Sequence, residues 1–151
     1  MAKKNSATFE SLNPVDGEVV GTFPIHSEKE VYAAVTLATD AAVRWNELGH
    51  KGRRKVLLAY SRLILREIDS LAETVTLETG KPHSDAKLEI TLAAHHVAWA
   101  ARHAESVLRT AHRSPGALMA NMSATVERSP LGVVGVIGPW NYPVFTPMGS
   151  I

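Results

Sequence analysis

The apolar residues of this chain fall first into two short stretches and then into three long stretches with helical spacing. The short stretches, residues 9–12 and 18–23, predict two strands. In the segment that joins them, Pro14 suits the second position of a turn, and Gly17 can adopt a positive φ where the turn ends. The pattern predicts a β-hairpin, preceded by a polar, flexible N-terminus over residues 1–8.

The first helical stretch has a defined start and a defined end. Ser27 followed by Glu30 has the form of a capping box, in which a hydroxyl and a carboxylate accept hydrogen bonds from amides at the helix start. Apolar residues then recur every three or four positions as far as Trp45. Gly49 can serve as the left-handed cap that ends this helix.

Two further helices are expected. The second begins near Gly52, carries an apolar stripe that continues to Val75, and ends before Pro82, because proline cannot continue a helix interior. The third is expected over residues 84–111, where a cluster of chain-breaking residues at positions 113–116 follows it.

The pattern changes again after residue 122. Residues 123–128 alternate and include β-branched side chains, whereas residues 131–137 form an apolar run without a polar side chain. Such a run is typical of a strand that is buried on both faces, as in a parallel sheet. Three prolines near the end predict a loop there: Pro139, Pro143 and Pro147. A parallel strand needs neighbours, and none can follow within these residues, so we interpret the chain as a fragment.

The composition is that of a globular protein without a marked charge. Of the 151 residues, 45% are hydrophobic and 21% are charged, and the formal net charge is +1. Neither nucleic acid nor a membrane is expected as a partner, because both favour concentrated lysine and arginine. The N-terminus lacks the apolar run of a signal peptide, so a cytoplasmic location is expected. There is no cysteine, which excludes disulfides and thiol nucleophiles from these residues.

Most titratable residues indicate no catalytic or metal site. His96 and His103 are seven positions apart on the third helix, a rise of roughly 10 Å, which one metal ion does not easily bridge. Asp85 and Glu89 could share a helix face, but lysines lie close by, so a solvated helix start is the expected environment. Residues 132–138 carry glycines in a G-x-x-G-x-x-G spacing, which differs from the dinucleotide-binding fingerprint.

The turn at residues 138–143 is the exception. It places an indole and a carboxamide in a segment stiffened by prolines, beyond the expected buried strand. In open α/β sheets, ligands bind beyond the carboxyl ends of the strands. The side-chain amide of Asn141 could donate a hydrogen bond to a developing oxyanion. The alternative is that Asn141 caps the following turn, which is a common role of asparagine.

These motifs resemble those of the NAD(P)-dependent aldehyde dehydrogenase superfamily. Residues 127–143, with the sequence ERSPLGVVGVIGPWNYP, are similar to its P-x-G-V-x-x-x-I and P-W-N-[FY]-P patterns. Residues 13–24 resemble its opening hairpin, residues 27–45 its alanine-rich first helix, and residues 77–82 its E-x-G-K-P segment. The resemblance extends over about residues 10–151 and is to the N-terminal part of the family.

The resemblance implies a fold class and a division of the chain. The class is α/β, the N-terminal part of an aldehyde-dehydrogenase-like Rossmann-type domain, here mostly helical (hairpin, three helices, then strands) with an incomplete sheet. Residues 9–122 would form the helical N-terminal part of the cofactor-binding domain. Residues 123–129 would be a strand of the oligomerisation module, and residues 130–151 the first core strand and the truncated PWNYP loop. The complete protein would be a homodimer or homotetramer.

The resemblance also implies a reaction and a site. Family members oxidise an aldehyde to a carboxylic acid with NAD or NADP. A cysteine thiolate attacks the aldehyde, an asparagine amide stabilises the oxyanion, a hydride passes to the nicotinamide, and water activated by a glutamate releases the acid. Asn141 matches that asparagine. The family's cofactor-binding turn is matched by Ile137, Gly138, Pro139, Trp140 and Asn141.

The chain departs from the family pattern in what it lacks. The nucleophilic cysteine, the general-base glutamate motif, and the lysine and glycine-containing turn that hold the nucleotide are absent; in the family they follow the matched part. Without a thiolate no acyl intermediate can form, so these residues alone are not expected to be active. Two alternatives remain open. One is a non-catalytic fragment that associates with a full-length relative through residues 123–129, and the other is a truncated product without function.

Overall fold

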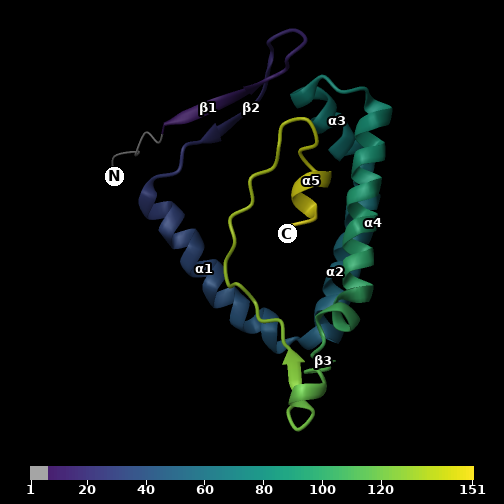
Figure 1. The fold of residues 1–151 in the computed structure, drawn as a ribbon. Helices are drawn as coiled ribbons and strands as arrows, with labels where there is room; N and C mark the ends of the chain where they lie inside the picture. Colours follow the sequence, from purple (N-terminus) through teal and green to yellow (C-terminus); the bar gives the residue numbers. More distant parts are fainter. Residues whose placement is uncertain (1–6) are drawn as a thin grey trace.

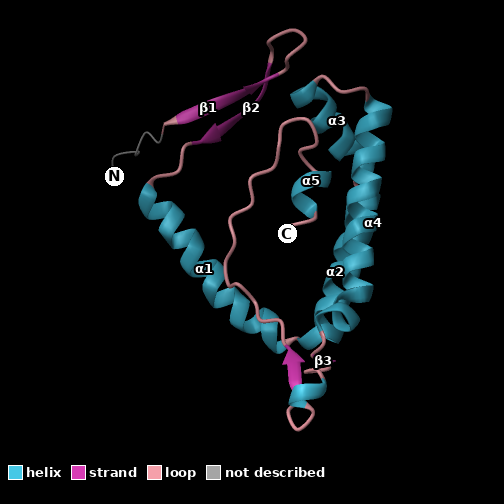
Figure 2. Cartoon of the chain, viewed as in Figure 1, coloured by secondary structure: helices cyan, strands magenta, loops and turns pink. Residues whose placement is uncertain are grey.

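The structure is a computed structural model that describes residues 7–151. Helices dominate it, and two small antiparallel sheets lie before and after them (Figures 1 and 2). The flexible segment expected over residues 1–8 lies mostly outside the described residues, and Thr8 already belongs to the first strand. The elements in chain order are β1 Thr8–Leu12, β2 Val19–Pro24, α1 Glu28–Glu47, α2 Gly49–Arg66, α3 Ile68–Thr79, α4 His83–Leu108, β3 Ala111–Arg113, the 3₁₀ turn Ala117–Met119, β4 Ala124–Val126 and α5 Phe145–Met148.

The predicted hairpin is confirmed. Strands β1 and β2 pair antiparallel, with Phe9 opposite Phe23 and their ring centroids 5.6 Å apart. Gly17 has a φ of 76°, a conformation that costs glycine little and other residues more, and its amide donates to the carbonyl of Asn13 at 2.8 Å. The local turn chemistry is therefore sufficient to reverse the chain at this point.

Helix α1 begins and ends as predicted. The capping box is complete, since the Glu30 amide donates to Ser27 Oγ at 3.4 Å and the Ser27 amide donates to the Glu30 carboxylate at 2.7 Å. Gly49 has a φ of 59°, as expected of the residue that ends the helix. No residue of α1 is buried, so its apolar stripe is covered only in part.

The second predicted helix is two helices. The helix is interrupted at Glu67, whose φ of −94° and ψ of 15° are not helical, and α3 begins at the next residue. The apolar stripe gave no sign of this break, because neither glycine nor proline interrupts it. The physical reason is tertiary: α2 and α3 pack against the single long helix α4 as two separate segments joined at Glu67.

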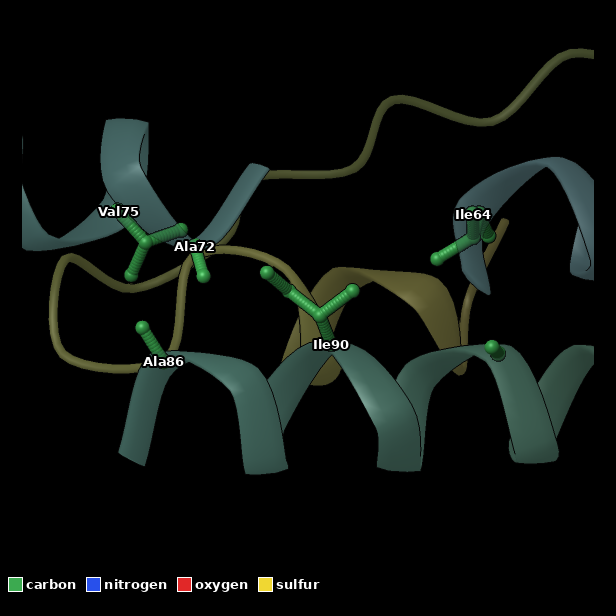
Figure 3. Close-up of a cluster of buried hydrophobic side chains, with 6 residues drawn as sticks. Ile64, Ala72, Val75, Ala86 and Ile90 are labelled. Atoms are coloured by element: carbon green, nitrogen blue, oxygen red, sulfur yellow. The ribbon is translucent and has the colours of Figure 1, made fainter. Parts of the chain in front are cut away.

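The core lies where α2, α3 and α4 meet. Ile90 is fully buried on α4 and lies between Ile64 of α2 and Val75 of α3 (Figure 3). Small side chains surround it and let the helices approach closely: Ala72, Ala86 and Ala94. Ser61 adds a buried link between α2 and α4, since its hydroxyl donates to the carbonyl of Ala94 at 2.8 Å.

The segment after α4 differs partly from expectation. The helix ends at Leu108 because residues 111–113 form β3, which pairs with β4. The strand expected over residues 123–129 is present as the short β4. Residues 131–137, however, form no strand, and the buried environment expected for them is wrong in this structure, since Leu131 is 92% exposed. The physical reason is that, among residues 7–151, no neighbouring strand lies beside them to share the hydrogen bonds of a ladder.

The extended segment instead runs along α1 before it turns back toward α4 (Figure 1). Its residues 132–135 line shallow apolar grooves against Ala38 and Trp45 of α1. The proline-rich end is a loop followed by the single turn of α5. No helix within residues 7–151 combines the length and the apolar character that crossing a membrane requires.

Candidate functional site

The loop of residues 138–144 is docked on α4 by close packing at both of its ends. A Cβ added at Gly138 would lie 2.9 Å from Cγ of Pro147, so only glycine lets the loop approach α5 this closely. Val144 and Met148 pack against the core formed by α2, α3 and α4. The ring of Phe145 meets His96 of α4 edge-on, with centroids 6.3 Å apart. The loop is thus held against α4 although it contains little regular structure.

A buried carboxylate lies beneath this loop. Glu89 of α4 is only 1% exposed, and its Oε1 accepts hydrogen bonds from the amides of Val144, at 2.9 Å, and Phe145, at 3.1 Å. Its Oε2 accepts from the ammonium of Lys81. The expected solvated environment is therefore wrong for Glu89, although Asp85, one turn earlier, is exposed.

Lys81 contacts the same loop from the segment that joins α3 to α4. Gly80 ends α3 with a φ of 71°, and this left-handed residue turns the chain so that Lys81 follows directly. The Lys81 ammonium donates to the carbonyl of Asn141 at 2.7 Å and lies 4.1 Å from the centroid of the Tyr142 ring. Its side chain is 14% exposed, so the ion pair with Glu89 is largely shielded from water.

The side chain of Asn141 is exposed and makes no hydrogen bond to any of residues 7–151. The capping role considered for it is thus not seen, because the turn that follows is held by Glu89 instead. Both N–H groups of the carboxamide remain available for a ligand. The backbone of Asn141 is therefore held in place, whereas its side-chain donor is open to solvent.

The neighbouring candidate residues form a continuous apolar edge on this loop. Ile137 is 99% exposed and Trp140 is 82% exposed, with Gly138 and Pro139 between them. Exposed apolar groups of this kind suit the face of a planar ring such as nicotinamide. The cation nearest to the loop, Lys81, is already engaged by Glu89 and is not available for phosphate. The described residues therefore fit one wall of a nucleotide site, at its nicotinamide end.

Sequence reasoning missed Glu89 and Lys81, although a signal was present. On α4, Glu89 lies among residues with helical spacing that are all buried: Ala86, Ile90, Ala93 and Val97. A carboxylate on the buried face of a helix must be paired, because an isolated buried charge is very costly. The partner follows from the E-x-G-K-P segment, whose lysine comes directly after the left-handed glycine.

Other charged and aromatic groups lie outside this site. Ser11 of β1 donates to Glu78 of α3 at 2.8 Å, which ties the hairpin to the helices. Lys87 donates to Asp69 and holds the pKa of that exposed carboxyl below its ordinary value of 3.8. Within residues 7–151, no three histidine, aspartate or glutamate side chains are grouped so that they could hold a metal ion.

Comparison with known proteins identifies the family of the chain. The family model described as "Aldehyde dehydrogenase family" matches residues 1–151. The chain belongs to the aldehyde dehydrogenase family. The expected family and the expected α/β class with an incomplete sheet are both confirmed.

Individual aldehyde dehydrogenases show how much of the family this chain spans. It is 32% identical over 143 residues to a succinate-semialdehyde dehydrogenase [NADP(+)] of Schizosaccharomyces pombe, which covers 95% of this chain and 29% of that protein. A crystal structure of an E. coli NADP-dependent enzyme matches with a TM-score of 0.85 and 32% identity, over 96% of this chain and 30% of that one. A NAD-dependent aldehyde dehydrogenase from Sinorhizobium meliloti matches with a TM-score of 0.82 and 33% identity, over 94% and 28%. The chain thus spans less than a third of the length of these relatives.

Proposed function

We propose that the protein carrying this chain oxidises an aldehyde to a carboxylic acid with NAD or NADP, and that Asn141 is its oxyanion donor. The observation that carries the proposal is the unengaged carboxamide of Asn141, on a loop whose backbone is held by Glu89 and Lys81. A donor held in place before the reaction stabilises developing charge without paying for reorganisation. The names of the relatives support the same reaction class, since they are aldehyde and semialdehyde dehydrogenases.

In this proposal the chain supplies part of a site rather than all of it. Attack of a thiolate on the aldehyde carbon turns the carbonyl oxygen into an oxyanion, and Asn141 donates a hydrogen bond to that oxygen. Since residues 1–151 contain no cysteine, the thiolate comes from a part of the protein outside this chain. This chain therefore contributes the stabilisation of charge, not the nucleophile.

NAD or NADP, when bound, accepts the hydride that leaves the aldehyde carbon. The residues of this chain that would hold it are Ile137, Gly138, Pro139, Trp140 and Asn141. The apolar side chains among them, those of Ile137, Pro139 and Trp140, would provide a wall that keeps water away from the reacting carbon. The relatives include both NAD- and NADP-dependent enzymes, and either cofactor is therefore proposed for this protein.

The proposal is tested in the natural protein that carries this chain. Formation of NAD(P)H is followed at 340 nm with succinate semialdehyde as the first substrate. Asn141→Ala is expected to lower kcat by about 10²–10³, the usual cost of removing one oxyanion donor. The matched control, Asn121→Ala, lies in an exposed turn and should retain full activity. Full activity of Asn141→Ala would refute the assignment.

A second candidate function is association with a full-length family member. It is favoured by the exposed apolar stripe of α1 and by the edge of β4, which pairs only with β3 among the described residues. Val126→Pro removes a backbone donor from this strand and should abolish co-purification with the partner. Val126→Thr keeps a β-branched residue and should retain it. Equal recovery of partner with both variants would refute association through this strand.

A further inference from the structure

We propose that Glu89 and Lys81 act together as a positioning pair that fixes the backbone of Asn141 and so the point from which its carboxamide extends. Neither residue is placed against the substrate or the cofactor. Both act through the backbone of the loop of residues 138–144 and the first amide of α5. The inference rests on the proposed role of Asn141 and assigns the groups that hold this donor in place.

The contacts lie at Asn141 itself and at the residues that follow it in the chain. Lys81 holds the carbonyl of Asn141 itself at 2.7 Å, and Glu89 holds the amides of Val144 and Phe145 at 2.9 and 3.1 Å. The ion pair joins these two anchors into one unit. A loop held at the carbonyl of Asn141 and three residues later has little freedom to move the backbone of Asn141. The position and direction of its Cα–Cβ bond are therefore set before any ligand arrives, which limits where the carboxamide can reach.

A carboxylate is the group that this position needs. Three N–H donors converge on Glu89, two from the backbone and one from Lys81, and both oxygens of a carboxylate accept. A glutamine would present its amide nitrogen either to the ammonium or to the two backbone amides. In both orientations donors face donors in a buried site, and one anchor of the loop is lost.

Lys81 is equally specific. Its ammonium makes three different contacts, with a carboxylate, a carbonyl and the face of an aromatic ring. A methionine of similar length fills the space but donates no hydrogen bond. Lys81→Met would therefore free the carbonyl of Asn141 and leave Glu89 without its counter-charge, while the loop keeps its packing against the core.

The first test measures the loop directly and needs no activity. Amide hydrogen exchange of Val144 and Phe145 is followed by NMR in the chain of residues 1–151. Glu89→Gln is expected to raise the exchange rate of both amides by about ten- to a hundredfold, through local opening of the loop. The buried amide of Ile90 is the internal reference, and Glu105→Gln, an exposed change on the same helix, is the matched control.

The result can separate anchoring from general stability. An increase at Val144 and Phe145 that exceeds the increase at Ile90 supports the positioning pair. An increase that is equal at all three amides reflects global destabilisation and overturns it, as does no increase at all. Lys81→Met provides a second variant in case Glu89→Gln unfolds the chain. It removes the counter-charge of Glu89 but keeps the carboxylate that accepts from Val144 and Phe145, so a smaller local increase, still above that at Ile90, is expected at these two amides.

The second test concerns the reaction of the natural protein that carries this chain. Glu89→Gln and Lys81→Met should lower kcat by at least about tenfold, because small displacements of a reacting group are costly, and should leave KM for the aldehyde nearly unchanged. In the double variant with Asn141→Ala, the loss should equal that of Asn141→Ala alone, since the pair acts only through that donor.

The outcomes distinguish the two proposals. Suppose that Asn141→Ala lowers kcat and that the fold-loss in the double variant is the product of the two single losses. Asn141 is then the donor, and the positioning role of Glu89 is wrong. If Asn141→Ala has no effect on kcat, the proposed function fails, and the positioning role fails with it. A shared, non-additive loss of kcat together with faster local exchange supports both.

Discussion

Truncation of Ile90 tests the core on which the candidate site is built. This side chain is fully buried between α2, α3 and α4, and Ile90→Ala removes three carbon atoms from it. Each buried methylene contributes about 0.8 kcal/mol, so the lost transfer energy is about 2.4 kcal/mol. The cavity that remains adds to this, which places the expected loss of unfolding free energy at about 2–5 kcal/mol.

The matched control is Leu88→Ala on the same helix. It also removes three carbon atoms, but Leu88 is 59% exposed, so only the remaining two-fifths of the transfer energy, about 1 kcal/mol, should be lost. Urea unfolding followed by circular dichroism at 222 nm measures both values, with unchanged slopes as the check on a two-state transition. If Ile90→Ala lowers the free energy of unfolding no more than Leu88→Ala does, Ile90 does not lie in the core between α2, α3 and α4.

Two further predictions concern a turn and a surface ion pair. Gly80→Ala should cost more stability than Gly17→Ala, although both glycines have positive φ, because only at Gly80 would the new methyl meet a neighbour, the ring of Pro14 at 3.3 Å. The conformational strain common to both is about 1–2 kcal/mol, and equal losses in urea unfolding would contradict the steric part. Lys87→Met should raise the pKa of Asp69 toward its ordinary value, because the hydrogen bond and the charge of Lys87 hold that pKa down. The stabilising contribution of Asp69 is present above pH 3.8 and is lost as the pH falls through the lowered pKa. A carboxyl NMR titration of the wild type and the variant measures the two pKa values of Asp69. Identical midpoints would contradict the prediction.

The candidate site is assembled from three parts of the chain that are far apart in sequence. Lys81 follows α3, Glu89 lies on α4, and the loop that carries Asn141 begins nearly fifty residues after Glu89. Only the loop was identifiable as a motif with chemistry of its own. The pair that holds it had only an indirect signal, a glutamate among buried positions of α4, and Lys81 lies between α3 and α4 with nothing in its spacing to mark it as the partner.

The exposed apolar surface of α1 and of residues 131–137 has a related cause. Helix α1 forms from its own capping box and spacing, so its apolar stripe is present even though residues 132–135 cover it only in part. The run at residues 131–137 has the composition of a buried strand, but a strand requires hydrogen bonds from neighbours rather than from itself. The helix depends on hydrogen bonds between residues a few positions apart, whereas the strand depends on a partner strand that is distant in the sequence. Residues 7–151 supply the first kind of interaction for these two segments but not the second.

By itself the sequence determined the features that local interactions decide. These are the β1–β2 hairpin with Gly17 at its turn, the capping box of α1, the helical spacing, and the family signature at the PWNYP loop. The tertiary structure alone decided where α2 ends at Glu67, which face of α4 is buried, and therefore that Glu89 is paired with Lys81 rather than solvated. The physical reason is that a hydrogen bond within a turn is set by residues a few positions apart. The environment of a carboxylate is set by whichever elements pack over it.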